Sequence, residues 1–239
     1  MNPSTAHRRS RLLGVVLALS LVAAACGSDS DDDAGTPGDG ELVGLFEIAA
    51  GECTGAEVAG TWFRMVQSGG TVADGPFVPN SDSTCTDDPT ITPLAPGSDG
   101  GLLAGSYQPL TDPAFDEGGS ALVSSIVQPT TWFAVGFGVS TNETDAQTND
   151  TVSPPAVSVD DAGILSGDLR AIAASWNGQH FNQGSPKPDG SLPGATTEPT
   201  GTYDAGSGAY TLEWTSQIEG GPFDGFVGVW HLEGTFTPA

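Results

Sequence analysis

The segment Trp176–Pro188 is the part of the chain whose side chains are best suited to bind a ligand. It combines aromatic rings, side-chain amides, a histidine and the only lysine. Amides donate and accept hydrogen bonds, and an aromatic face offers a stacking surface, so the segment favours a neutral polar ligand or a glycan. The candidate ligand-binding residues are Trp176, Asn177, Gln179, His180, Asn182 and Gln183. The alternative interpretation is a long connection between strands, with Phe181 in the core.

Signatures of catalysis and metal binding are sparse. Beyond residue 26 the histidines are His180 and His231, whose separation excludes an H-E-x-x-H zinc site. The sequence has no G-x-S-x-G turn, P-loop or dinucleotide-binding fingerprint. His231 and Glu233 would share one face of a strand, either as a solvated pair or around a metal ion or a proton. The acidic loops match no specific calcium-binding spacing, so we assign no catalytic residue, no metal and no other cofactor.

The first 25 residues have the form of a bacterial export signal. A basic start, His7 to Arg11, precedes an apolar run from Leu12 to Ala25. A transmembrane helix needs about 20 apolar residues, and this run is shorter, which is typical of a signal peptide. The run ends in three alanines followed by Cys26.

This ending resembles the lipobox of bacterial lipoproteins, in which small residues precede a cysteine that receives a diacylglyceryl group. The family usually has Leu where this chain has Ala23. The resemblance implies that Cys26 carries fatty acids such as palmitate on the extracytoplasmic side of the cell membrane. The alternative is an ordinary secretory signal that is cleaved before an incidental cysteine.

Residues 26–41 are rich in Asp, Gly and Ser and have no large apolar side chain. They predict a disordered acidic tether, because such a segment cannot offset its ordering entropy. From Cys26 onward three basic residues face thirty carboxylates, a net charge of −27. This charge excludes binding to nucleic acid and opposes contact with anionic lipids. The acyl chains on Cys26 would therefore hold the protein on the lipid bilayer, its expected partner.

Cys53 and Cys85 are the cysteines that remain once Cys26 is lipidated. In an exported protein an even pair predicts a disulfide. A redox pair or a metal site is the weaker interpretation, because neither cysteine lies in a C-x-x-C motif or near a histidine.

Residues 42–239 are predicted to form one all-β domain, an antiparallel β-sandwich or barrel. The chain has 34 Gly and 18 Pro, residues that interrupt helices, and no window keeps a helical period. Short apolar runs bounded by turn residues predict strands instead. These runs are Leu42–Ile48, Thr61–Gln67, Ala121–Val127, Thr131–Ser140, Ala156–Val159, Asp168–Trp176, Ala209–Thr215 and Phe226–Phe236.

The last of these runs has the clearest alternation. Its large apolar side chains recur at every second position, which predicts a strand with one face in the core. They are Phe226, Trp230, Leu232 and Phe236. The stretch from Tyr210 to Gly234 also resembles the C-terminal part of uncharacterised secreted or surface β-domain proteins of bacteria, a resemblance that implies no particular activity.

We therefore interpret the chain as a membrane-anchored extracytoplasmic lipoprotein that acts as a binding or structural module. One alternative is a β-barrel that holds a small apolar ligand. A second is a hydrolase that uses a pair of carboxylates, which thirty acidic residues leave open. The identity of the ligand and the oligomeric state do not follow from the sequence.

Overall fold

The computed structural model describes residues 40–239 except residue 56. Cys26, the expected signal peptide and most of the expected tether lie outside these residues. The described strands form three antiparallel sheets of eleven, four and two strands. The predicted all-β antiparallel class is confirmed.

The eleven-stranded sheet is organised around its longest strand, β17. In spatial order it contains β1 (Gly40–Glu41), β11 (Ala156–Val159), β12 (Ile164–Asp168), β15 (Thr197–Tyr203), β16 (Ala209–Gln217), β17 (Val227–Pro238), β2 (Gly44–Ile48) and β8 (Gly101–Ala104). The N-terminal part of β17 also pairs with β5 (Trp62–Thr71), which carries β6 (Gly75–Phe77) and β7 (Ile91–Pro93). In the described part of the chain the outer strands β1 and β8 do not pair, so this sheet curls without closing into a barrel.

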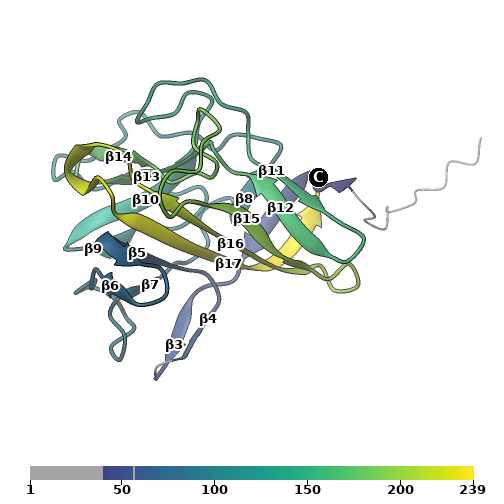
Figure 1. Ribbon diagram of the computed structural model, residues 1–239, viewed down its shortest axis with the longest axis horizontal. Coiled ribbons are helices and arrows are strands. Elements are labelled where there is room, and N and C mark those ends of the chain that lie inside the picture. Colours follow the sequence, from purple (N-terminus) through teal and green to yellow (C-terminus); the bar gives the residue numbers. More distant parts are fainter. Residues whose placement is uncertain (1–39, 56) are drawn as a thin grey trace, which may run out of the picture. The chain divides into compact units, whose positions relative to one another are not determined.

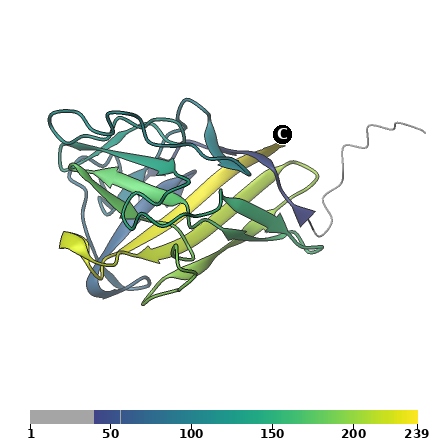
Figure 2. The ribbon, with the colours of Figure 1, turned by 90° about the horizontal axis from the view of Figure 1, so that it is seen from above.

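The four-stranded sheet packs against one face of the large sheet, beside β5 and the start of β17 (Figures 1 and 2). Its strand order is β14 (Gln179–Asn182), β13 (Ile172–Trp176), β10 (Val135–Thr141) and β9 (Thr130–Trp132). The third sheet is the hairpin of β3 (Glu52–Thr54) and β4 (Glu57–Ala59), and a 3-10 turn covers Gly221–Phe223. The two larger sheets therefore form a sandwich-like arrangement.

The core between these sheets follows the alternation of β16 and β17. Trp214 of β16 and Trp230 of β17 stack with ring centroids 5.5 Å apart, and Phe137 of the small sheet lies 6.1 Å from Trp230. Leu232 and Phe236 are buried on the same face. The predicted core face of the last strand is thus confirmed for three of its four large residues. Phe226 is the exception, because it lies before β17 and its carbonyl accepts the Ile218 amide to close the preceding loop.

The run Thr131–Ser140, predicted as one strand, is a tight hairpin of β9 and β10. Phe133 and Ala134 form its turn with φ of 51° and 61°. Such left-handed backbone usually requires glycine or asparagine in a two-residue hairpin. Neither residue type is present, so the sequence held no signal for this turn.

Two other predicted strands also differ from the structure. Asp168–Trp176 is divided, because β12 ends at Asp168 and the chain crosses to the small sheet before β13 begins. Ala121–Val127 forms only isolated bridges and bonds instead to the loop around Ser98. Val123, Ile126 and Val127 are buried whereas Leu122 is exposed, so the prediction of a strand was wrong although part of the run belongs to the core.

The Cys53–Cys85 disulfide is present in the structure. Cys53 lies in β3, Cys85 lies in the loop between β6 and β7, and their Cα atoms are 5.3 Å apart. The bond ties the small β3–β4 hairpin to that long loop. The pairing predicted from the cysteine count is confirmed.

The β structure begins two residues before Leu42, the expected start of the domain. Gly40 and Glu41 pair with Val159 and Ser158 of β11. Among the residues described here, no helix is long and apolar enough to cross a bilayer.

Candidate functional site

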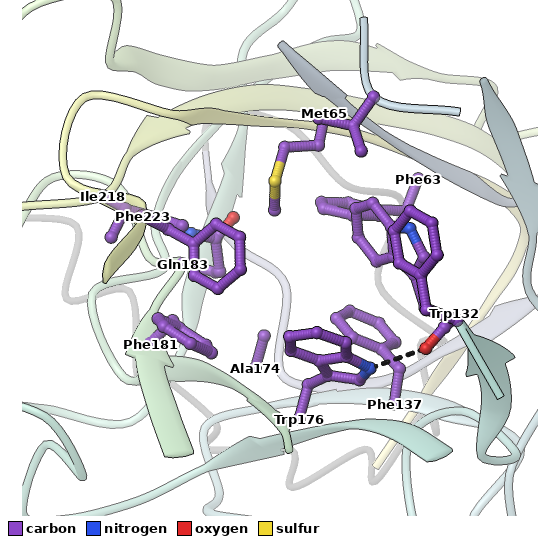
Figure 3. A pocket seen from close by; sticks show the side chains of 12 residues that line it. Phe63, Met65, Trp132, Phe137, Ala174, Trp176, Phe181, Gln183, Ile218 and Phe223 are labelled. Atoms are coloured by element: carbon purple, nitrogen blue, oxygen red, sulfur yellow. Dashed lines mark hydrogen bonds between the residues drawn. The ribbon is translucent and has the colours of Figure 1, made fainter. Parts of the chain in front are cut away.

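A pocket lined by aromatic rings, here called the aromatic pocket, lies between the two large sheets near the start of β17 (Figure 3). The volume of its cavity is about 50 Å³. The space between its walls is about 470 Å³ when the open mouth is included. Its lining residues are Phe63, Met65, Val78, Trp132, Phe133, Phe137, Ala174, Trp176, Phe181, Gln183, Ile218 and Phe223. Both sheets and the β16–β17 loop therefore build it.

Ring contacts and one hydrogen bond hold the walls of this pocket. The Phe63 ring lies 5.3 Å from the rings of both Trp132 and Phe137. The indole N–H of Trp176 donates to the Trp132 carbonyl at 2.8 Å, which joins β13 to β9 across the pocket floor (Figure 3). None of the described lining residues presents a polar atom to the open space. The pocket therefore suits a group that needs no hydrogen bond.

Gln183 closes the inner side of the pocket, and its polar atoms serve the core. Its Oε1 accepts a hydrogen bond from the indole N–H of Trp230 at 3.0 Å. Its backbone oxygen accepts a hydrogen bond from the indole N–H of Trp214 at 2.8 Å. Gly228 of β17 leaves the room for this arrangement, because a Cβ there would collide with Oε1 of Gln183. The polar groups of Gln183 therefore position the two tryptophan side chains.

The β13–β14 hairpin separates the six predicted ligand residues. Its tip is Asn177-Gly178, with φ of 51° and 71°, the residue types favoured by a two-residue hairpin turn. Because side chains alternate along a strand, Trp176 and Gln183 reach the aromatic pocket, whereas His180 and Asn182 face the other side. The other two, Asn177 at the exposed tip and the half-buried Gln179, line no pocket described here. The structure therefore does not bring the six side chains into one groove.

Asn182 is the centre of a buried polar network. Its side-chain amide donates to Asp145 Oδ2 at 2.7 Å and to the Arg170 carbonyl at 3.0 Å. Its backbone amide donates to Gln147 Oε1 at 2.6 Å, and its Oδ1 accepts the ammonium of Lys187 at 3.3 Å. Asn182 thereby fixes the loop of residues 142–152 onto β14.

Lys187 is a buried cation in this network, with 4% of its surface exposed. Its ammonium donates to the Asn182 carbonyl at 3.1 Å and to Ser216 Oγ at 2.7 Å. Burial lowers the pKa of Lys187 to about 8, although the charges of Glu219 and Asp145 oppose the shift. A polar cavity of about 120 Å³ adjoins it, with Asp150, Asp189 and Glu219 among its walls. The ammonium has three hydrogen-bond acceptors in the structure. Lys187 therefore has a structural role.

The stability of the protein should therefore rise with pH in a manner that depends on Lys187. The folded-state pKa of about 8 lies below the ordinary value of 10.5, so the unfolded chain binds the proton more tightly and folding gains as pH rises between these values. Relative to Lys187→Met, the wild type should gain about 3 kcal/mol between pH 7 and pH 10.5. Urea unfolding of both proteins across this range measures it. Parallel pH profiles of the two proteins would contradict the prediction.

Ser175 and His180 form the hydrogen-bonded pair closest to a catalytic serine arrangement. Ser175 Oγ lies 2.8 Å from His180 Nδ1, and burial lowers the pKa of His180, with Asp145 opposing the shift. Ser175 has no exposed surface, and Phe115 covers the imidazole with ring centroids 4.8 Å apart. The serine hydroxyl is therefore inaccessible to a substrate in this arrangement.

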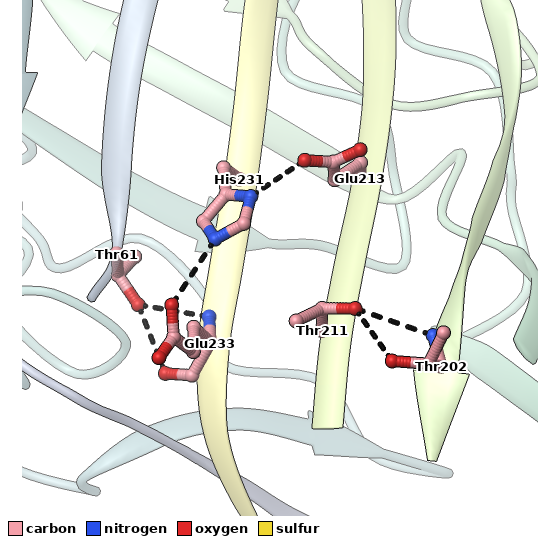
Figure 4. Close-up of polar contacts among 6 residues, drawn as sticks. All are labelled: Thr61, Thr202, Thr211, Glu213, His231 and Glu233. Atoms are coloured by element: carbon pink, nitrogen blue, oxygen red, sulfur yellow. Dashed lines mark hydrogen bonds and ion pairs between the residues drawn. The ribbon is translucent and has the colours of Figure 1, made fainter. Parts of the chain in front are cut away.

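His231 and Glu233 lie on the outer face of the large sheet, as their spacing predicts (Figure 4). His231 Nδ1 is 2.6 Å from Glu213 Oε1 on β16, and its Nε2 is 3.4 Å from Glu233 Oε2. Its ring stacks on Trp62 with centroids 5.3 Å apart, and 16% of its side chain is exposed. The histidine is thus a cross-strand link between two carboxylates.

The acidic side chains of the described loops mostly accept hydrogen bonds from backbone amides of the same loop. Asp116 Oδ1 accepts the amides of Gly118 and Ser120, and Asp160 makes the same pattern in the β11–β12 turn. Asp88 pairs with Arg64 at 2.6 Å. Within residues 40–239, residue 56 aside, no three His, Cys, Asp or Glu side chains are placed to hold a metal ion.

Most walls of the aromatic pocket carried no signal of their own in the sequence. Phe63, Trp132 and Phe137 belong to predicted strands, but nothing in their spacing shows that the strands meet around a cavity. The glycines around Phe223 were the one local hint of an unusual loop. Comparison with protein-family models, with curated proteins and with solved structures gives no match for this chain.

Proposed function

We propose that the protein is a lipid-anchored, extracytoplasmic binding protein whose aromatic pocket holds an apolar group of its ligand. The observation that carries this proposal is an open cavity between two sheets whose described walls present no polar atom. Pockets for small molecules are mostly apolar clefts lined by hydrophobic and aromatic side chains. The sequence left an apolar ligand as an alternative to a polar one, and the pocket chemistry favours the apolar ligand.

The pocket differs from a packing defect of the core. A second void lies among Leu94, Trp214, Leu232 and other fully buried residues, and it offers only about 20 Å³ to the centre of a water-sized sphere. The rim of the aromatic pocket is open by contrast, since 49% of the Phe133 surface is exposed. An exposed aromatic rim beside an apolar cavity is expected of a binding site.

The same geometry rules against a glycan in this pocket. A sugar would bury hydroxyl groups against walls without partners for them, and each such group costs about 1–3 kcal/mol. The functional groups that the sequence assigned to a polar ligand are engaged elsewhere, Asn182 in its network and Gln183 beneath the tryptophans.

The pocket also lies away from the start of strand β2 at Gly44. Phe63 in its wall pairs with Trp230, whereas Gly44 pairs with Pro238. These positions on β17 are separated by about 26 Å at about 3.3 Å per residue. The aromatic pocket and the start of β2 therefore lie toward opposite ends of β17.

Binding should be detectable with a small neutral hydrocarbon such as toluene. The wild-type protein should bind toluene saturably and should not bind glucose. Ala174→Leu fills the pocket from the buried side and should weaken toluene binding at least about tenfold, since the added side chain occupies the space of the ligand. Equilibrium dialysis with the full chain measures both. Equal toluene binding by the wild type and a folded Ala174→Leu protein would contradict the assignment of the pocket.

Lipidation of Cys26 is open to a direct test. Protein extracted from bacterial membranes should begin at Cys26 and carry the mass of a diacylglyceryl group, because the export signal ends immediately before that cysteine. Cys26→Ala should lose both the acyl mass and the membrane association, since a stable anchor requires two acyl chains. Intact-mass spectrometry of membrane and soluble fractions measures this. An unmodified amino terminus after Cys26 would contradict the lipoprotein proposal.

A further inference from the structure

The loop between β16 and β17, Ile218–Phe226, here called the lid loop, contributes Ile218 and Phe223 to one side of the aromatic pocket. Gly220, Gly221 and Gly225 adopt φ of 78°, 70° and 79°. A Cβ on Gly220 or Gly221 would meet no atom within 4 Å. The backbone conformation therefore favours glycine at these two positions, and steric crowding does not require it.

The hydrogen bonds of the lid loop are mostly internal. Gly220 N–H donates to Asp224 Oδ1 at 2.6 Å, Gly225 N–H donates to the Ile218 carbonyl at 2.9 Å, and the Ile218 amide donates to the Phe226 carbonyl at 2.8 Å. One bond in the described part of the chain links the loop to another segment, from Gln147 Nε2 to the Glu219 carbonyl at 2.8 Å. Few hydrogen bonds therefore hold residues 219–225 to the rest of the described chain, whereas Ile218 is buried and anchors the start of the loop.

The ring of Phe223 is the contact that residues 219–225 make with the pocket. It meets Trp176 edge to face at 5.9 Å and 71°, and Phe181 at 5.6 Å and 84°. Figure 3 shows it beside Gln183 and above Phe181, at the margin of the open space. Phe223 is only half-buried, so less packing holds it than holds a core phenylalanine.

We propose that the ligand group of the aromatic pocket is a planar aromatic ring that takes the place of the Phe223 ring, and that the lid loop swings out to admit it. This inference rests on the proposed function of the pocket. With Phe223 in its observed position the cavity has a volume of about 50 Å³, well below the volume of sites for whole small molecules, about 300–1,000 Å³. Displacement of Phe223 supplies the missing room.

The walls around Phe223 favour a ring over a saturated group of equal size. Edge-to-face contacts depend on the positive edge of one ring meeting the negative face of another. Trp176 and Phe181 already meet a ring in this geometry. A saturated ligand would fill the volume but lose both contacts, so it should compete less well for the same position.

The test compares toluene with its saturated counterpart methylcyclohexane, using the full chain and three variants. Phe223→Ala should bind toluene at least about tenfold tighter than the wild type, because the internal competitor is gone. It should also prefer toluene to methylcyclohexane by about threefold or more. Phe223→Leu, which keeps apolar bulk without a ring, should bind toluene more tightly than the wild type but less tightly than Phe223→Ala. Phe226→Ala is the matched control, since Phe226 touches Phe223 at 5.4 Å but does not line the pocket.

The outcomes separate this inference from the proposed function. If the wild type and folded Phe223→Ala bind toluene equally, or the variant binds it more weakly, Phe223 is a fixed wall and the lid is refuted while the pocket keeps its function. If Phe226→Ala raised the affinity for toluene as much as Phe223→Ala does, the cause would be a general loosening of the loop, and this result would also refute the lid. A preference for methylcyclohexane would overturn the aromatic ligand class. Absence of binding by every protein would overturn the proposed function itself.

Discussion

Trp230→Ala is expected to lower the free energy of unfolding by about 3–5 kcal/mol, the usual cost of truncating a buried tryptophan. Trp230 is 2% exposed, stacks on Trp214 at 5.5 Å and packs against Phe63 at 4.5 Å. Its removal leaves a cavity where the two sheets meet and leaves Oε1 of Gln183 without its donor. Urea unfolding followed by fluorescence of the remaining tryptophans measures the loss.

His231→Ala is the matched control, because it truncates the next residue of the same strand on the opposite face. It removes a stack on Trp62 and two contacts with carboxylates at the surface, which together contribute about 0.5–1.5 kcal/mol. The tryptophan variant should therefore be the less stable by a wide margin. If His231→Ala proved the more damaging, the outer face would carry a role beyond cross-strand pairing and the register of β17 would need revision.

Asn182→Ala should cost about 3–5 kcal/mol, since each buried polar group that loses its partner costs about 1–3 kcal/mol. The substitution removes the donor to Asp145 Oδ2 at 2.7 Å and to the Arg170 carbonyl at 3.0 Å. It also removes an acceptor of the Lys187 ammonium. The loop of residues 142–152 should then loosen from β14.

Gln179→Ala provides the comparison, because it truncates another amide of β14 that is only half-buried. It should change the unfolding free energy by less than about 0.5 kcal/mol. Hydrogen exchange of the Asp145 and Gln147 amides should accelerate in Asn182→Ala and stay unchanged in Gln179→Ala. Similar stability of the two variants would show that the network contributes little.

The parts of the fold that alternation and cysteine counting could reveal were predictable from the sequence. Trp230, Leu232 and Phe236 show the period of a strand, and burial of one face follows from that period alone. The Cys53–Cys85 bond follows from there being no other pair once Cys26 is set aside. The strand period and the cysteine count can both be read from the sequence without knowing which strands pair.

The candidate site was beyond such reasoning because it depends on pairing between distant strands. Trp176 and His180 lie close in sequence, yet the tight Asn177-Gly178 turn and the strand period place them on opposite faces. The Phe133 turn has residues that rarely adopt its backbone conformation, so its position at the pocket rim had no sequence signature. The residue types of Trp176–Pro188 indicate polar and aromatic contacts, but nothing in their spacing shows that the segment divides between a pocket wall and a structural network.

The methyl group of Met65 offers the most direct test of the claim that the aromatic pocket binds an apolar ligand. The chain has two methionines, Met1 and Met65, and the thioether of Met65 points into the pocket (Figure 3). In protein labelled with ¹³C at the methionine methyl groups, the resonance missing from Met65→Leu identifies this site. Titration with toluene should shift that resonance saturably in the wild type, and the shift should vanish in Ala174→Leu. A Met65 resonance that stays unchanged up to the solubility limit of toluene would contradict the proposed binding function.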